Sequence, residues 1–586
     1  MVVKLGHLLL IIHLALLVHG EARSSEPGLI GYWKLEGDCQ DYSGLGNHGQ
    51  NHGVDLETSG FNGQDSYAEV PDHSTLRLGT GDFSFSAEVY TQRDLRDSIG
   101  DLLSKFDPGE RQGLCVSASA NTSGYNAQND VRQWFFGLDN NTSGTWIDCG
   151  RPGDSTHISD ALTVFQGSLY AGTTDGEHES DWAHVYRYKA RQEWEDCGRL
   201  GTGRTRGVYA MIVHDGALYA ATSASHGPQP PDMSFGRVYR YLGGKEWEDI
   251  GQPGENYRLN SLASFKGKLY VTGFNIGPAP GHCYVYEGGQ KWKECGEFKG
   301  WPHALAVHDG KLYAAYPQGE VYAYDGNSWE DLGNPFGSFA ECNQIHSIGI
   351  YRGELHVGTW PKGKVAVWRG NRWVDLGRPG DATEVIGLSV YNGSLYAGTI
   401  PRAEVFRFDG PDRWTSVRRI FDPPGFEPVP VGSGAREVQD WSRASSLAVF
   451  QGKLFVSTAT CYRTMIERLP ANDVRGKVFS YQTGSSVSFD HDAGPGWVHI
   501  AAIRRGRALE LYIDGALVSE SQSGSEPVDV STGAPLRIGF GPNAHFCGRI
   551  RHVRLHNRAL DAEQVNGLKR DIPGRARRNE TPAGRS

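Results

Sequence analysis

The sequence predicts an all-β protein, mainly because two short motifs alternate along its middle part. The first motif is a Trp followed by acidic and apolar residues and then Gly, as in Trp194-Glu195-Asp196-Cys197-Gly198. The second reads Gly-x-Leu-Tyr, as in Gly216-Ala217-Leu218-Tyr219. A repeat of about 40–50 residues with several short strands in each copy is typical of a β-propeller.

The two series of motifs are out of phase, which is the third observation. Each motif occurs seven times, but the Trp series starts one step early, at Trp146. The last Gly-x-Leu-Tyr copy, at residues 452–455, has no Trp strand after it. If the ring closes, the strand at Trp146 must complete the last blade. The sequence therefore predicts a seven-bladed β-propeller over residues 145–482, in which the strand at Ile147 pairs with residues 478–481.

Each repeat predicts four strands, and the first two are joined by a tight turn. The dipeptides Asp215-Gly216, Asp309-Gly310 and Asn392-Gly393 favour primed hairpin turns, which need positive φ. An inner pair around a glycine, then a Tyr-rich strand and a Trp strand, resembles kelch-type propellers. Kelch blades usually carry Gly-Gly after the second strand, where this chain has Gly172-Thr173. We therefore describe the repeat as kelch-like, with the Trp side chains packed between blades.

Alternating strands also precede and follow the repeats. The first half opens with a Tyr32-Trp33 strand and an Asp41-Tyr42-Ser43-Gly44 loop, and the second contains a Trp497 strand and Leu511-Tyr512-Ile513-Asp514-Gly515. These motifs resemble the laminin-G-like, or concanavalin-A-like, jelly roll. The resemblance implies one antiparallel jelly-roll sandwich, with its first half at residues 27–140 and its second at 485–570, split by the inserted seven-bladed propeller.

The composition and the two ends of the chain indicate where the protein is located. The chain has 586 residues and a net charge of −10, which argues against a broad nucleic-acid surface. Residues 1–20 read as a secretory signal peptide, with Lys4 ahead of a short apolar run. We expect a secreted, extracellular or periplasmic protein without a membrane span, ending in a disordered tail at 571–586. A disulfide between Cys39 and Cys547 is one open alternative among the nine cysteines.

The loops at one end of the propeller carry polar and aromatic residues that converge on a funnel, the usual ligand face of this fold. The loops before the inner strands carry a first set, which is His157, Arg206, Asn260, His303, His346, Glu384 and Arg443. A second set, after the second strands, includes Trp182, His282 and Trp360. The ligand-binding residues that we predict are Arg206, Asn260, His303, His346, Trp360 and Arg443. The alternative is that these loops are simply solvated.

No cofactor is expected for a binding protein, with a structural calcium ion as the alternative that the jelly-roll resemblance implies. Asp41 and Asp65 lie in turn-rich loops at the predicted rim of the jelly roll, and carboxylate oxygens suit calcium. The other reading of both residues is an Asx-type turn with no ion.

Three classes of function stay open. The first is a secreted, non-catalytic protein that recognises a glycan or another extracellular protein. The second is a carbohydrate-active enzyme (a lyase, hydrolase or oxidase) with its site in the funnel, for which a metal at His303 and His346 is one alternative. The third is a structural surface protein. No sialidase-type box, nucleophile elbow or phosphate loop is found, so we expect no catalytic residues.

Overall fold

The computed structural model describes residues 26–569, except 121–126, 154–155, 177–181, 202–204, 225–234, 276–279, 301, 317, 425–441, 460–473 and 522–525. Over these residues the fold is almost entirely antiparallel β-structure, and its one α-helix is α2 (Ala562–Leu568). No helix of the described part is long and apolar enough to cross a membrane. The predicted signal peptide and C-terminal tail lie outside the described residues.

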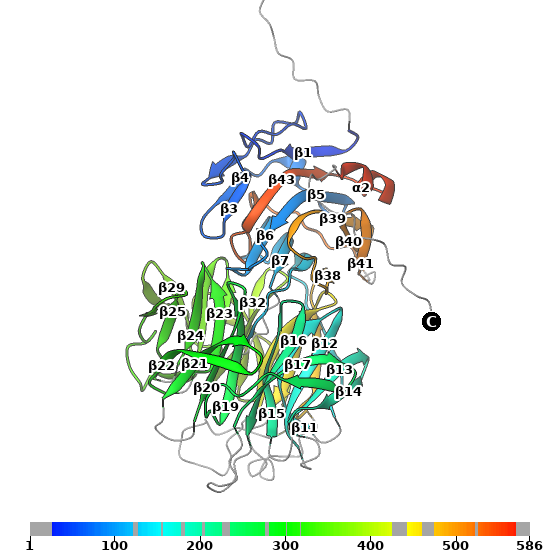
Figure 1. The fold of residues 1–586 in the computed structure, drawn as a ribbon. Coiled ribbons are helices and arrows are strands. Elements are labelled where there is room, and N and C mark those ends of the chain that lie inside the picture. Colours follow the sequence, from blue (N-terminus) through cyan, green and yellow to red (C-terminus); the bar gives the residue numbers. More distant parts are fainter. Residues whose placement is uncertain are drawn as a thin grey trace, which may run out of the picture.

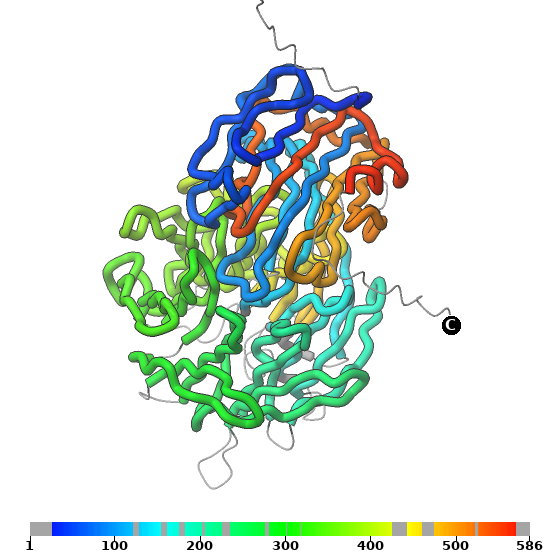
Figure 2. The backbone as a smooth tube through the Cα atoms, turned by 45° about the horizontal axis from the view of Figure 1, so that its top comes forward, coloured from blue at the N-terminus to red at the C-terminus, as the bar shows by residue number. Residues whose placement is uncertain are grey.

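Two seven-stranded sheets, here called the outer sheets, each combine strands from both ends of the chain (Figures 1 and 2). The first contains β1 (Leu29–Trp33), β43 (Cys547–His556), β5 (Phe83–Thr91), β39 (Gly496–Arg505), β40 (Ala508–Ile513), β41 (Ala516–Glu520) and β3 (Gly60–Asn62). The second contains β2 (Gln50–His52), β4 (Tyr67–Val70), β42 (Leu536–Ile538), β6 (Ile99–Asp107), β7 (Gln112–Ser119), β9 (Gln133–Asn140) and β38 (Ser485–Phe489).

One apolar core lies between the outer sheets. It joins Phe85 and Ile500 of the first sheet to Leu103, Phe136 and Ile538 of the second, all fully buried. Because successive side chains of a strand point to opposite faces, alternate apolar residues of each strand enter this core. Residues from before and after the repeats therefore share one hydrophobic interior.

The predicted alternative of a disulfide between Cys39 and Cys547 is wrong, because both side chains are free thiols. Cys547 lies in β43 of the first outer sheet, whereas Cys39 lies in the loop between β1 and β2. The Cys39 carbonyl accepts a hydrogen bond from the Gly49 amide, just before β2, whereas Cys547 pairs with Asn62 of β3.

Between the outer strands, the chain forms seven successive four-stranded groups within the described residues. Groups 1 to 3 are β11 (Thr156–Phe165), β12 (Ser168–Gly176), β13 (His184–Ala190) and β14 (Glu193–Arg199); β15 (Thr205–His214), β16 (Ala217–Ala224), β17 (Val238–Gly243) and β18 (Glu246–Asp249); and β19 (Arg258–Phe265), β20 (Lys268–Phe274), β21 (Gly281–Gly288) and β22 (Lys291–Phe298). Groups 4 to 6 are β23 (Ala304–His308), β24 (Lys311–Ala315), β25 (Val321–Tyr324) and β26 (Trp329–Asp331); β27 (Cys342–Tyr351), β28 (Glu354–Pro361), β29 (Val365–Arg369) and β30 (Arg372–Asp375); and β31 (Glu384–Tyr391), β32 (Ser394–Ile400), β33 (Glu404–Gly410) and β34 (Arg413–Arg419). Group 7 is β35 (Arg443–Phe450), β36 (Lys453–Ala459), β37 (Val478–Gln482) and β10 (Thr145–Asp148).

The first strands of the seven groups contact one another in chain order, and β35 contacts β11, so the groups close into a ring. The turns between the first and second strands have the predicted positive φ at both residues. These angles are 43° and 72° at Asp215-Gly216 and 42° and 85° at Asn392-Gly393. Such primed turns match the right-handed twist of the strands that they join.

The predicted pairing of the strand at Ile147 with residues 478–481 is confirmed. In the β10–β37 ladder Ile147 lies opposite Ser480, and Trp146 opposite Tyr481. Directly beyond this ladder, Leu138 of β9 pairs with Ser485 of β38 in the second outer sheet. The two places where the chain passes between ring and outer sheets therefore lie side by side.

The Trp side chains pack between neighbouring groups, as expected, and most of them also form a hydrogen bond there. Among the described residues, six of the seven donate the indole Nε1–H to a carbonyl at the end of the preceding group's fourth strand. These bonds are Trp194 to Cys149 (2.8 Å), Trp247 to Cys197 (2.9 Å), Trp292 to Ile250 (3.0 Å), Trp329 to Cys295 (2.8 Å), Trp373 to Leu332 (2.9 Å) and Trp414 to Leu376 (3.2 Å). The Nε1 of Trp146 is buried and has no hydrogen-bond partner among these residues.

The outer sheets lie against the end of the ring at which the first strands end and turn into the second strands (Figure 1). A short strand, β8 (Ala127–Gln128), pairs in parallel with Leu262 and Ala263 in the second half of β19. Beside it, Asn129 Oδ1 accepts a hydrogen bond from the Val213 amide at 2.7 Å. Residues 127–129 therefore cover this end of the ring's central axis.

We expect Trp194→Phe to destabilise the protein more than Trp146→Phe does. Both rings pack against a tyrosine, Tyr188 at 5.1 Å and Tyr481 at 4.7 Å, but only Trp194 loses a hydrogen bond. The difference should be about 1 kcal/mol in the free energy of unfolding. Thermal and denaturant unfolding of both variants would measure it, and equal losses would contradict the proposed role of the indole hydrogen bonds.

Candidate functional site

The candidate site lies on the ring axis at the start of the first strands, the end away from β8. The backbone explains this placement, because each first strand begins at that end and runs toward the outer sheets. Asn260 lies at the start of β19, whereas β8 pairs with Leu262 and Ala263 further along the same strand. The residues that precede or begin the first strands therefore lie together at this end of the ring.

Two buried histidines from neighbouring groups form the centre of the site. His303 directly precedes β23 of group 4 and His346 lies in β27 of group 5. Their ring centroids are 4.4 Å apart, and the planes are tilted by 32°. The exposed fractions of the two residues are 6% and 7%, so both imidazoles are largely removed from water.

His346 lies between two oxygen atoms. Its Nε2 is 2.8 Å from Gln344 Oε1, and its Nδ1 is 3.2 Å from Glu384 Oε1 of the buried carboxyl group in β31. A neutral imidazole carries one N–H, which Nε2 donates to Gln344. Nδ1 then carries the lone pair, and neither Nδ1 nor Glu384 Oε1 forms a hydrogen bond among the described residues, although the two atoms are 3.2 Å apart.

The pKa values of these groups agree with that arrangement. Burial, together with the positive charges of Arg443 and Arg258, lowers the pKa of His346 to about 3. Burial also lowers the pKa of His303, and burial raises the pKa of Glu384 against the opposing charge of Arg443. Both imidazoles are therefore neutral at neutral pH, and in this form they hydrogen-bond to neutral polar ligands without a charge penalty.

Asn260 adds a hydrogen-bonding group beside His303. Its Nδ2 donates to the Pro302 carbonyl at 2.6 Å, which fixes the amide next to the histidine loop. Its Oδ1 is buried and has no hydrogen-bond partner among the described residues. A buried unpaired acceptor costs about 1–3 kcal/mol, so this oxygen is a candidate ligand contact.

The six predicted ligand residues fall into two sets. His303 and His346 are in contact, Arg443 is close enough for its charge to act on both, and Asn260 lies beside them. Arg206 instead lies over the Trp182 ring, 5.5 Å from its centroid. Trp360, half-buried in β28, lies opposite Gln344 in the β27–β28 ladder.

Sequence reasoning missed Arg258 and Gln344. Arg258 lies two residues before Asn260, and its guanidinium lies 3.5 Å from the centre of the Tyr209 ring. Gln344 lies two residues before His346. Residues i and i+2 of a strand share a face, so this spacing was the signal that could have found both. His157 was part of the predicted set, but its side chain lies outside the described ones.

Asp41 and Asp65, the predicted calcium ligands, each form turn hydrogen bonds. The buried Asp41 carboxylate accepts from the amides of Tyr32, Ser43 and Asn47 and from the Ser43 hydroxyl, at 2.8–2.9 Å. Asp65 is exposed, and its Oδ1 accepts from Asn62 Nδ2 at 2.7 Å. The turn reading accounts for these contacts, and calcium stays a prediction.

Two cavities of about 660 Å³ lie away from the axis. One separates Tyr351 and Phe408 of the ring from Phe540 and His545 beside the outer sheets. The other lies between groups 1 and 2, beside Trp247. Neither cavity is lined by the histidine pair. The buried hydrogen-bonding groups of His303, His346, Glu384 and Asn260 lie instead on the axis, which makes this cluster the candidate site.

One family model matches part of the chain. Residues 441–566 match the concanavalin A-like lectin/glucanases superfamily, in its laminin G form. This segment takes in β35 to β37 of group 7 as well as β38 to β43 of the outer sheets, and it supports the resemblance predicted for residues 485–570. No curated protein matches the chain significantly by sequence.

Several solved structures are similar to the chain at low identity. Virginiamycin B lyase from Staphylococcus aureus, as a catalytically inactive variant with quinupristin, is 10% identical, with a TM-score of 0.41 over 58% of this chain and 99% of its own. Trypanosoma rangeli sialidase with the inhibitor DANA is 13% identical, with a TM-score of 0.30 over 72% of this chain and 98% of its own. YCF48 from Cyanidioschyzon merolae is 14% identical, with a TM-score of 0.37 over 57% and 98%.

We expect His346→Gln to flatten the dependence of stability on pH below neutrality. An unfolded histidine titrates near pH 6.5, whereas folded His346 has a pKa of about 3. Between these values the unfolded chain binds more protons, so the free energy of unfolding falls as the pH falls. From pH 7 to pH 5 the wild type should lose about 2 kcal/mol more than the variant.

Denaturant unfolding at pH 7 and pH 5 would measure this difference. Glu384, whose raised pKa acts in the opposite direction, is present in both proteins. Parallel losses in wild type and variant would contradict a neutral, buried His346.

Proposed function

We propose that this chain is a secreted binding protein that recognises a glycan or an extracellular protein, without catalysis. We further propose that residues 145–482 are a seven-bladed, kelch-like β-propeller, inserted between the two halves (27–140 and 485–570) of a laminin-G-like jelly roll. The closed ring of seven groups and the shared core of the outer sheets support this architecture. The signal-like residues 1–20 and the concanavalin A-like match support export.

The observation that carries the proposal is the polar cluster on the ring axis. Asn260 Oδ1 is buried without a hydrogen-bond partner among the described residues, and it lies beside the neutral pair His303 and His346. A buried polar atom without a hydrogen bond lowers the stability of the protein. A ligand that supplies the missing hydrogen bond offsets this loss. A sugar hydroxyl both donates and accepts, so a glycan matches this set of neutral groups better than an apolar ligand does.

Screening the purified protein on a glycan array, without added metal, tests the proposal. Once a ligand is found, Asn260→Ala should weaken binding about tenfold or more, because one hydrogen bond to a buried group is lost. His499→Asn provides the matched control, since His499 is equally buried but lies in β39 of the outer sheets. Equal affinities of the two variants would place the ligand elsewhere.

A second candidate is a carbohydrate-active enzyme with the same site. The pair formed by Glu384 and His346, 3.2 Å apart, favours it, because a carboxyl and an imidazole in contact can pass a proton between them. Release of product from a polysaccharide, abolished by His303→Ala and by His346→Ala, would favour this function. Binding with no product would favour the first.

A further inference from the structure

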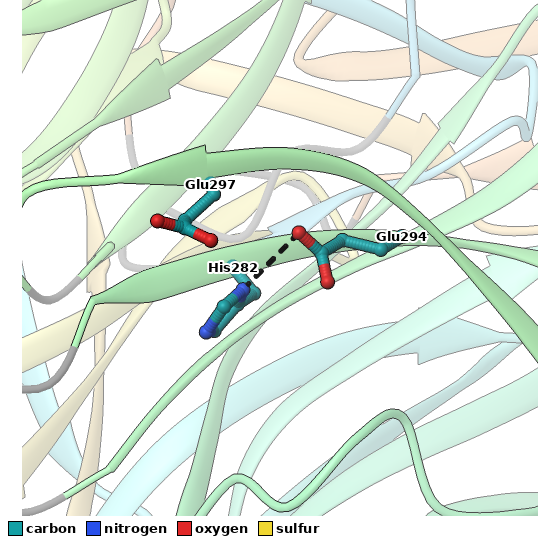
Figure 3. A group of neighbouring side chains, drawn as sticks. All are labelled: His282, Glu294 and Glu297. Carbon is teal, nitrogen blue, oxygen red and sulfur yellow. Dashed lines mark ion pairs between the residues drawn. The ribbon is translucent and has the colours of Figure 1, made fainter.

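Three potential metal ligands lie together on group 3, away from the ring axis. His282 is in β21, and Glu294 and Glu297 are in the adjacent β22. One ligand atom from each lies within 4.8 Å of the other two, and no other such group of three is found among the described residues. Figure 3 shows both carboxylates turned toward the imidazole, with His282 Nδ1 at 3.4 Å from Glu294 Oε1.

A β-bulge explains why both glutamates face the histidine. Residues three apart in a regular strand point to opposite faces of the sheet. In β22 the register shifts at Cys295, so that His282 pairs with Glu297 while Tyr284 pairs with Glu294. The extra residue turns Glu294 onto the face that already carries His282 and Glu297.

The equivalent positions of other groups show what normally occupies this place. Cross-strand pairing aligns them, and in five other groups a cation faces an acid. These pairs are His184 with Asp196 (2.9 Å), Arg237 with Asp249 (2.6 Å), Lys364 with Asp375 (3.4 Å), Arg419 with Glu404 (3.2 Å) and Lys477 with Asp148 (3.0 Å). Group 4 has Glu320 and Asp331 with no histidine.

Group 3 alone combines two carboxylates with one imidazole. Where group 1 has Arg199, group 3 has Glu297, so the positive charge is replaced by a negative one. His282 has a side chain that is 21% exposed, and its Nδ1 makes no hydrogen bond among the described residues, with Glu294 Oε1 at 3.4 Å. The site therefore has an excess of negative charge beside an imidazole nitrogen whose hydrogen-bonding capacity is not used.

We propose that His282, Glu294 and Glu297 bind a divalent transition-metal ion, with Zn²⁺ as the best match. One imidazole nitrogen and two carboxylate oxygens, completed by water, form a four-coordinate zinc site with an open position. Calcium and magnesium prefer all-oxygen ligand sets, so the imidazole argues against them. The half-exposed position lets the glutamates adjust to the distances that zinc requires.

This zinc site lies on the same end of the sheet as the polar cluster. Leu259, Gly273, His282 and Glu297 are successive partners in one row across group 3. Two strand spacings separate Leu259 from His282, which is about 10 Å. The site is thus on the rim of the proposed ligand face, but it depends on none of the axis residues.

Zinc titration of the full-length, chelator-treated protein tests the proposal. We expect wild type to bind Zn²⁺ in competition with a chromophoric chelator, and Glu297→Gln and His282→Asn each to weaken binding by at least tenfold. Loss of even an indirect partner typically costs 10–100-fold. His184→Asn, at the equivalent position of group 1, is the matched control and should bind like wild type.

Cobalt provides a second readout, because Co²⁺ in such a site absorbs visible light. Wild type and His184→Asn should show the same spectrum, and Glu297→Gln should lose it. Because the Glu297 side chain is exposed, Glu297→Gln should unfold at the same temperature as wild type, which would exclude misfolding as the cause. Equal zinc affinity in wild type and both site variants, or no zinc binding by wild type, would overturn the proposal. Neither result would alter the glycan test, which contains no metal.

Discussion

The pairing of β10 with β37 is the constraint on which the rest of the structure depends. It joins segments more than three hundred residues apart, and it brings the entry to and exit from the ring to one place. From there, β9 and β38 can pair as neighbours in the second outer sheet. Both outer sheets are then completed by strands from the two chain ends, with one shared core. Closing so long a loop costs entropy only logarithmically in its length, so one good ladder can offset it.

The ring closes at the strand of Trp146, the one repeat Trp whose indole makes no hydrogen bond among the described residues, and other contacts stabilise this junction. Arg111 and Asp139, both buried, form an ion pair at 3.0 Å beside the crossing, and burial raises the pKa of Asp139 to about 6. Asn392 donates through Nδ2 to the carbonyls of Leu138 and Thr483, at 3.0 and 2.9 Å. A turn residue of group 6 thus binds both crossing segments, beside the group whose Trp146 makes no indole hydrogen bond among the described residues.

Period and phase made the ring and its closing strand predictable, because each repeat must bury the same faces and satisfy the same ladders. The direction of the first strands also made it predictable that His303, His346 and Asn260 lie at one end of the ring, near one another. Glu384 was also in the predicted set, whereas Gln344, two residues before His346 in the same strand, was missed. The sequence pattern does not encode the approach of Glu384 to His346, because the two residues belong to neighbouring groups. The bulge at Cys295, and the wrong disulfide expectation, both depended on register, which only the paired strands fix.

The two ends of the ring are unequal for a physical reason. At one end, β8 and the outer sheets supply hydrogen bonds to the first strands, so that Gln128 and Asn129 satisfy the amides of Val307 and Val213. At the other end, the polar groups rely on one another, and the acceptor of Asn260 is left over. At this end the rim carries the carboxylates of Glu294 and Glu297, whereas the axis carries the neutral His346 beside the positive charges of Arg443 and Arg258. Under the proposed function, the negative rim and the axis, with its neutral and positive groups, would therefore act on different properties of a ligand.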